Sequence, residues 1–271
     1  MTELFAMEFF RNAFIMSCIL SVLFGLLSFF VVMRKMSFLG AGIAHTAFGG
    51  VALGIFFSID PFVSSLVFCT ISALLIGKLV RHSAISYDTG IGIFFAFSMA
   101  LGAIFISLKK SYSFDLMGYL FGNILGVSLT DVFLAVGALV LFVPFIYLFL
   151  HRILFMTFDE EVAAVSGVNT GLLDTVLLMF LASIIVISIK IVGIILVSAL
   201  VVLPASFGML FAKDYRKVLL TGILFTISIM IAGLYLSYFI DTPAGATIVT
   251  AGTLVYFTAV AVTWGLQKLR G

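Results

Sequence analysis

The sequence predicts an all-α polytopic membrane protein, with about nine transmembrane helices and one short or re-entrant helix. Hydrophobic residues make up 63% of the 271 residues and charged residues only 10%, so a water-soluble domain of this composition could not cover its surface. Apolar runs near the ~20 residues that span a bilayer also recur along the whole chain. They cover residues 12–33, 38–58, 62–80, 90–108, 131–150, 172–189, 191–211, 218–240 and 245–266.

Helix-start signals mark two of the boundaries between these runs. Asp60 and Thr242 each precede a proline, Pro61 and Pro243, which is the usual order of a capping residue and the first helical residue. Segment 113–129 is rich in glycine and polar residues, and it is the expected short or re-entrant helix. No stretch is long or polar enough for a soluble domain, so we expect one transmembrane domain over residues 1–271.

The distribution of lysine and arginine predicts the orientation. If 113–129 does not cross the membrane and the N-terminus lies outside, inside loops hold ten of the fourteen basic residues. This bias agrees with the positive-inside rule, and it disappears if 113–129 crosses. We therefore expect nine spans and a cytoplasmic C-terminus. Lys190, between two spans on the outside, is expected to reach the lipid headgroups.

The loop at 151–171 carries the signals of a short cytoplasmic helix near 157–168. Thr157 followed by Glu160 fits a capping box, in which two side chains pair with free backbone amides. Gly167 is a natural C-terminal stop. A loop that only joined two spans would need a few turn residues, so the helix indicates a further role.

The first turn of this helix is acidic, with Asp159, Glu160 and Glu161, and its apolar face contains Val162 and Val165. One interpretation is an interfacial helix that rests on lipid. Such helices usually carry basic residues on the polar face. We therefore favour docking to a partner protein.

His45 is the only ionisable group of the apolar segment 37–54. An imidazole at membrane depth is costly unless it faces protein or a water-filled path, and it is a common ligand of borderline metal ions. Five glycines surround it, so another helix or a permeating solute can approach closely. The alternative is a buried histidine bonded to a backbone carbonyl, but membrane depth favours a functional role.

Three aspartates are candidates for an outer mouth. Asp115 opens segment 113–129, where it either caps a helix or meets a cation. Asp60 and Asp241 lie outside in the expected orientation, away from most basic residues, where their charge would attract a divalent cation. The alternative is that both only cap the helices that follow.

Four stretches together resemble the membrane permease subunits of ATP-binding-cassette importers for zinc, manganese and iron. They are residues 37–54, 115–125, 158–167 and 190–205, and with family-like spacing they extend over essentially the whole chain. The resemblance implies a fold similar to the vitamin B12 and siderophore permeases, and a homodimer around one central path. It also implies two cytoplasmic ATPase subunits and an extracytoplasmic metal-binding protein.

The resemblance further implies that 158–167 is the coupling helix that fits into a cleft of the ATPase. The residues expected to meet the ATPase are Phe158, Asp159, Glu160, Glu161, Ala164 and Gly167. The chain departs from the family at Ala41, where many members carry an aspartate four residues before the histidine. One imidazole per subunit makes a weak, transient metal site, and it favours zinc over manganese or iron.

The expected function is therefore a non-catalytic permease subunit in a prokaryotic plasma membrane. The chain carries none of the common hydrolase motifs and no phosphate-binding loop, so ATP hydrolysis is expected on a separate chain. No permanently bound cofactor and no nucleic-acid partner are expected; besides its protein partners the chain contacts lipid and the transported ion. The alternative is a self-sufficient metal carrier or channel, although such carriers usually place more carboxylates inside the membrane.

Overall fold

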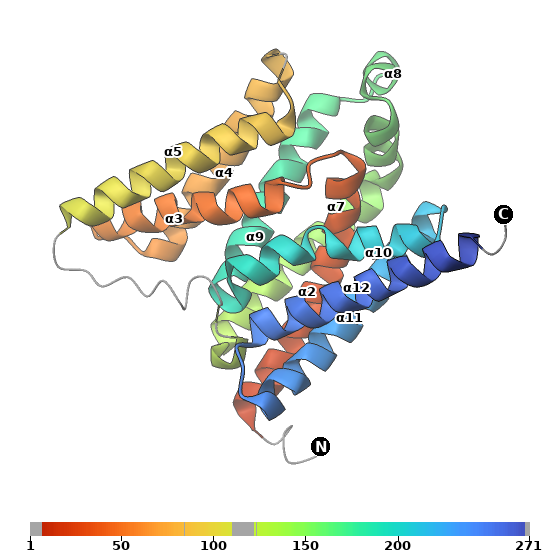
Figure 1. Ribbon diagram of the computed structural model, residues 1–271. Helices are drawn as coiled ribbons and strands as arrows, with labels where there is room; N and C mark the ends of the chain where they lie inside the picture. Colours follow the sequence, from red (N-terminus) through yellow and green to blue (C-terminus); the bar gives the residue numbers. More distant parts are fainter. Residues whose placement is uncertain (1–6, 84, 110–121, 123, 269–271) are drawn as a thin grey trace.

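The computed structural model describes residues 7–83, 85–109, 122 and 124–268, and within this part every regular element is helical (Figure 1). The helices follow the apolar runs of the sequence. They are α2 (Glu8–Met33), α3 (Leu39–Phe57), α4 (Pro61–His82), α5 (Tyr87–Leu108), the 3₁₀ turn η1 (Ile124–Gly126), α7 (Leu129–Phe158), α8 (Glu160–Val165), α9 (Thr170–Leu200), α10 (Leu203–Phe211), α11 (Tyr215–Ile240) and α12 (Ala244–Lys268).

The described part of the chain has eight helical segments that are long and apolar enough to cross a membrane, and one of them is a double span. The segment Thr170–Phe211 has 42 residues. A straight helix of that length would measure roughly 60 Å, about twice the hydrocarbon thickness of a bilayer. Its helical geometry is broken at Gly193, with φ 78° and ψ 166°. The bend divides this segment into two spans, so the prediction of about nine is confirmed.

Five side chains from different segments meet at one end of the helices, called here the α8 end. Arg34 follows α2, Arg81 ends α4, Tyr87 opens α5, Glu160 opens α8 and Asp174 lies near the start of α9. Because these contacts place the end of α4 and the start of α5 at the same end of the molecule, α4 and α5 run in opposite directions.

The opposite end, called here the Lys190 end, is also fixed by contacts. Lys190 bonds Asp131 at the start of α7, and its ammonium lies over the ring of Phe62 at the start of α4. Lys109, directly after α5, donates to the carbonyl of Ile55 near the end of α3. The end of α5 and the start of α7 therefore lie on the same side.

The described helices on either side of segment 113–129 meet at the same end of the molecule, because α5 ends and α7 begins at the Lys190 end. This is the arrangement expected if 113–129 does not cross the membrane, which stays a prediction. Most of that segment, including Asp115, lies outside the described residues. Its described part forms the turn η1 rather than an α-helix.

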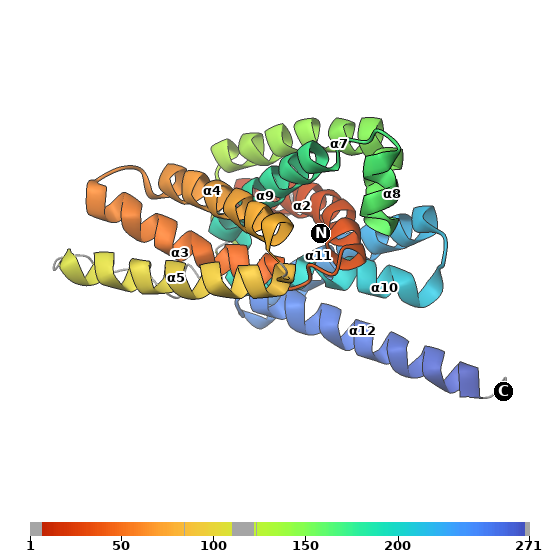
Figure 2. The ribbon, with the colours of Figure 1, turned by 90° about the horizontal axis from the view of Figure 1, so that it is seen from above.

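Helices α2 and α9 lie in the centre of the molecule, with the other helices around them (Figure 2). Large apolar side chains of α2, such as Phe24 and Phe30, are fully buried. The outer helices α5, α7 and α12 instead expose apolar side chains, among them Leu148 and Trp264. A surface of this kind is stable only against lipid or another protein, which fits a membrane-spanning bundle.

Candidate functional site

His45 lies near the middle of α3, on a strip of the helix that the protein leaves partly open. Ala41 and Phe48, one turn away on either side, share this strip, and all three residues are half-buried. The imidazole ring packs edge-on against Phe95 of α5, with 5.1 Å between the ring centroids. One side of the imidazole is therefore supported within the chain, and the half-buried His45 keeps part of its surface open to a partner or a solute.

The glycines around His45 serve close helix packing within the chain. A Cβ atom at Gly42 would lie 1.9 Å from the side chain of Ile91 in α5, and one at Gly50 would lie 2.5 Å from the Cα of Ser65 in α4. A side chain at Gly42 would force the Ile91 side chain to move, and one at Gly50 would force the backbone of α4 away. The expectation that glycine lets another helix come near His45 is thus confirmed for α4 and α5.

A resident metal site is not assembled in the part of the chain that the structure describes. No three histidine, cysteine, aspartate or glutamate side chains lie close enough there to hold an ion. Ala41, on the same strip as His45, contributes no ligand. A single imidazole among apolar neighbours suits brief contact with a borderline ion rather than tight binding.

The outer-mouth candidates occupy two helix ends. Asp60 caps α4 by accepting a hydrogen bond from the Val63 amide at 2.9 Å, and Pro61 is the first helical residue, as predicted. Asp60 also lines a cavity of about 310 Å³ together with Lys190. Asp241 does not cap the helix that follows. It ends α11 in a left-handed conformation with φ 56°, because the chain must reverse before α12.

Lys190 and Asp131 form an ion pair that no pattern in the sequence predicts. Their side chains lie 2.5 Å apart, so Lys190 is held by protein rather than only by lipid headgroups. Asp131 also exchanges hydrogen bonds with Ser128 in a capping box at the start of α7. The spacing of Ser128 and Asp131 could have revealed the cap, but no local signal links Asp131 to Lys190.

A short helix, α8, is present where the sequence predicts one near 157–168, but it covers only Glu160–Val165. Thr157 is not its capping residue, because α7 continues to Phe158 and the Thr157 hydroxyl donates to the Ile153 carbonyl. Asp159 caps α8 instead, by accepting a hydrogen bond from the Val162 amide at 2.9 Å. Gly167 follows the helix with φ 86°, as expected of a stop.

Most of α8 is exposed. Ala163 is the residue that is fully buried, whereas the side chain of Val165 is 91% exposed. Glu161 and Ala164 are exposed as well, and so is Phe158 directly before the helix. The helix is therefore anchored by one small side chain and presents its remaining surface outward.

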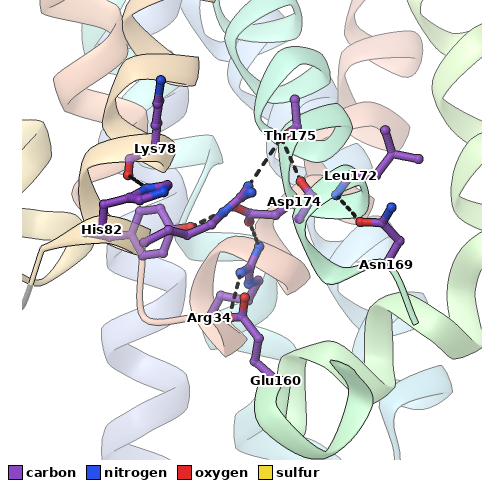
Figure 3. Close-up of polar contacts among 11 residues, drawn as sticks. Arg34, Lys78, His82, Glu160, Asn169, Leu172, Asp174 and Thr175 are labelled. Carbon is purple, nitrogen blue, oxygen red and sulfur yellow. Dashed lines mark hydrogen bonds and ion pairs between the residues drawn. The ribbon is translucent and has the colours of Figure 1, made fainter. Parts of the chain in front are cut away.

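A buried charge cluster lies beside α8, and Asp174 is its centre (Figure 3). The Asp174 carboxylate is fully buried and accepts hydrogen bonds from Arg81 at 2.7 Å and from the Tyr87 hydroxyl at 2.9 Å. Arg34 bonds its other oxygen. Thr175 also accepts a hydrogen bond from Arg81, at 3.3 Å. One carboxylate thus joins the C-terminal ends of α2 and α4 and the start of α5 to the start of α9.

Arg34 also connects this cluster to α8. Its second terminal nitrogen lies 3.7 Å from the Glu160 carboxylate, and its side chain is only 5% exposed. Burial lowers the pKa of the Arg34 guanidinium, but Asp174, Tyr87 and Glu160 together outweigh burial and raise that pKa above its ordinary value. From the sequence Glu160 is expected on a partner-facing surface, and no local pattern reveals the cluster, because its members are far apart in the chain.

Comparison with known proteins gives matches over nearly the whole chain. Residues 6–263 match the family described as the ABC 3 transport family. The chain is 32% identical over 245 residues to the high-affinity zinc uptake system membrane protein ZnuB of Haemophilus influenzae, with 90% of this chain and 94% of the relative covered. It is 33% identical over 252 residues to the manganese transport system membrane protein MntC of Listeria monocytogenes, with 93% and 90% covered.

Two solved structures share the fold. PsaBC from Streptococcus pneumoniae in complex with Fab is 31% identical, with a TM-score of 0.82 and with 95% of this chain and 93% of that chain covered. An inward-facing ABC transporter of the metal-chelate type is 15% identical, with a TM-score of 0.75 and with 93% and 85% covered. At that low identity the likeness concerns the fold alone, and it confirms the expected ABC permease architecture.

Proposed function

The chain belongs to the ABC 3 transport family, and on this premise we propose that it is the transmembrane permease subunit of an ATP-driven importer of divalent transition-metal ions. The observation that carries the proposal is the family match over residues 6–263, together with relatives named for zinc and manganese transport. A bundle of apolar helices with the half-buried His45 on a partly open strip of α3 is consistent with this role. ATP is hydrolysed on a separate chain.

The α8 end faces the cytoplasm of a prokaryotic cell, and the N-terminus lies outside. The positive-inside count supports this orientation. The arrangement of the helices supports it too, since α5 ends and α7 begins at the same Lys190 end, and the later loops then keep the sides that the count assigns to them. The whole chain acts as one permease domain in the plasma membrane.

Two copies of the chain form a homodimer with His45 of each subunit near the shared path. The partly open strip of Ala41, His45 and Phe48 supports this placement, because an imidazole at membrane depth needs a polar or metal partner. Two facing imidazoles would give the ion two nitrogen ligands. Such a ligand set favours zinc over manganese or iron.

The exposed surface of α8 binds the ATPase. Val165 and Ala164 offer a small apolar surface, and the neighbouring Phe158 adds a large exposed ring. Exposed apolar groups at a water-facing end of a membrane protein are costly unless a partner covers them. Asp159, Glu161 and Gly167 lie at the edges of this surface. An extracytoplasmic metal-binding protein docks at the Lys190 end, near Asp60, Asp115 and Asp241.

The test is ATP-driven zinc uptake into proteoliposomes that contain this chain, its ATPase and its metal-binding protein. His45→Ala should reduce uptake at limiting zinc while the complex still assembles. His151→Ala is the matched control, because His151 is exposed near the α8 end of α7 and lies off the proposed path. Unchanged uptake by His45→Ala would remove His45 from the path.

A self-sufficient carrier or channel is the alternative function. The same proteoliposomes distinguish it, since a carrier of that kind would transport zinc with neither ATP nor the ATPase present. Uptake that requires both ATP and the partner chains supports the importer.

A further inference from the structure

Arg34 binds two carboxylates on two different elements with two different nitrogens. One terminal nitrogen bonds Asp174 of α9, and the other lies 3.7 Å from Glu160 of α8. Figure 3 shows the Arg34 side chain between these two acids. Only a guanidinium has this forked set of donors, whereas a lysine ammonium is a single point of charge.

The two contacts of Arg34 differ in how easily they can be broken. Asp174 is fully buried, and Arg81 and Tyr87 hold it as well. The Glu160 side chain is 47% exposed and lies on a helix that is anchored mainly through Ala163. Water can therefore replace Arg34 at Glu160 at little cost, but it cannot do so at Asp174.

The charges of the cluster balance only when Glu160 takes part. Asp174 and Glu160 carry two negative charges, and Arg34 and Arg81 carry two positive charges. If Glu160 moves away, one buried carboxylate faces two guanidinium groups. Displacement of α8 would therefore leave the cluster with one positive charge that no carboxylate in it balances.

The cluster continues toward His45 through α3 and α5. Arg34 precedes the short link to α3, and its guanidinium lies over the ring of Tyr87, the first residue of α5. Phe95, about two helical turns further along α5, contacts the His45 ring. A change at Arg34 thus acts on both helices that hold His45.

We propose that the Arg34–Glu160 pair is the link through which displacement of α8 by the ATPase reaches α3 and α5. Glu160 is then a positioning residue that acts within the chain, through Arg34, rather than a contact for the ATPase. The inference rests on the proposed importer function. It adds one electrostatic step, the Arg34–Glu160 contact, between movement of the ATPase and the proposed metal path at His45.

The first experiment measures zinc uptake per ATP hydrolysed in proteoliposomes of the full complex. Glu160→Gln keeps the size of the side chain but removes its charge. ATPase binding and hydrolysis should persist, while zinc transported per ATP falls about fivefold, as expected for a partly exposed ion pair. Asp88→Asn is the matched control, because Asp88 is an exposed acid at the same end, next to Tyr87, and should leave the ratio unchanged.

The second experiment uses Arg34→Lys, which keeps the positive charge beside Asp174 and so preserves the buried pair. A lysine cannot bind both carboxylates in the forked geometry, so this variant should fold and show the same loss of coupling as Glu160→Gln. The double variant should be no worse than either single variant, since both remove the same link.

Three outcomes would overturn the link. The first is an unchanged transport ratio in Glu160→Gln. The second is loss of ATPase binding in that variant, which would make Glu160 a docking contact. The third is additive losses in the double variant. If the parent complex itself shows no ATP-dependent uptake, the proposed importer function fails instead, so the two failures are distinguishable.

Discussion

The backbone of Gly122 lies directly against the backbone of Gly193. A Cβ atom at Gly122 would stand 2.3 Å from the Gly193 nitrogen, closer than side chains approach in real proteins. Both glycines have positive φ angles, 67° and 78°, and Gly193 is the point at which α9 bends. The bend that separates two membrane spans therefore depends on a contact between two residues without side chains.

Gly193→Ala should destabilise the protein. Its φ and ψ lie in a region that is nearly restricted to glycine, so alanine costs about 1–3 kcal/mol there. Gly137→Ala in α7 is the matched control. No atom beyond the neighbouring backbone of α7 lies within 4 Å of the Cβ position there, so alanine should be neutral or stabilising. Thermal unfolding in detergent compares the two variants, and equal midpoints would contradict the strained bend.

Asp174→Asn should lower the stability more than any exposed aspartate does. The change leaves the guanidinium groups of Arg34 and Arg81 without a carboxylate at a fully buried position. Removing one partner of a buried ion pair typically costs about 3–5 kcal/mol. Arg81 is partly exposed, so the lower part of that range is expected. Asp214→Asn is the control, since asparagine can keep that helix cap, and denaturation in detergent should show little change for it.

Val165→Asp should weaken ATPase binding without changing the stability of the permease. The Val165 side chain is 91% exposed, so a charge there meets only water until a partner covers it. Buried in the proposed ATPase cleft, the carboxylate would lose its hydration. Co-purification with the ATPase measures the effect, with Ser83→Asp, an exposed change elsewhere at the α8 end, as the control. Full ATPase binding by Val165→Asp would exclude α8 from the interface.

Replacing Asp60, Asp115 and Asp241 by asparagine should slow docking of the metal-binding protein at low salt and matter little at high salt. Asparagine retains most capping ability, so the cap of α4 at Asp60 should survive while the charge is lost. Long-range attraction is screened by salt, which gives the expected dependence. Association rates at two ionic strengths provide the measurement. Identical rates for the variant and the parent would leave these aspartates with structural roles alone.

The sequence by itself determined the features that are encoded within about 20 consecutive residues. The apolar runs predicted the spans, and Asp60 with Pro61 marked the start of α4. The basic residues predicted which loops lie on which side of the membrane. Gly167 likewise marked the end of α8. These signals are local, because a span needs only length and apolar composition, and a cap needs only the neighbouring amides.

Only the tertiary structure decided which polar groups meet. Asp174 lies 140 residues from Arg34 and 93 from Arg81, and Lys190 lies 59 residues from Asp131. Membrane helices are apolar on most sides, so the periodicity that identifies the inner face of a soluble helix is weak here. The faces in contact are selected by close packing at residues such as Gly42 and by these few buried charges. Their pairing follows from the folded arrangement of the helices, which no single segment contains.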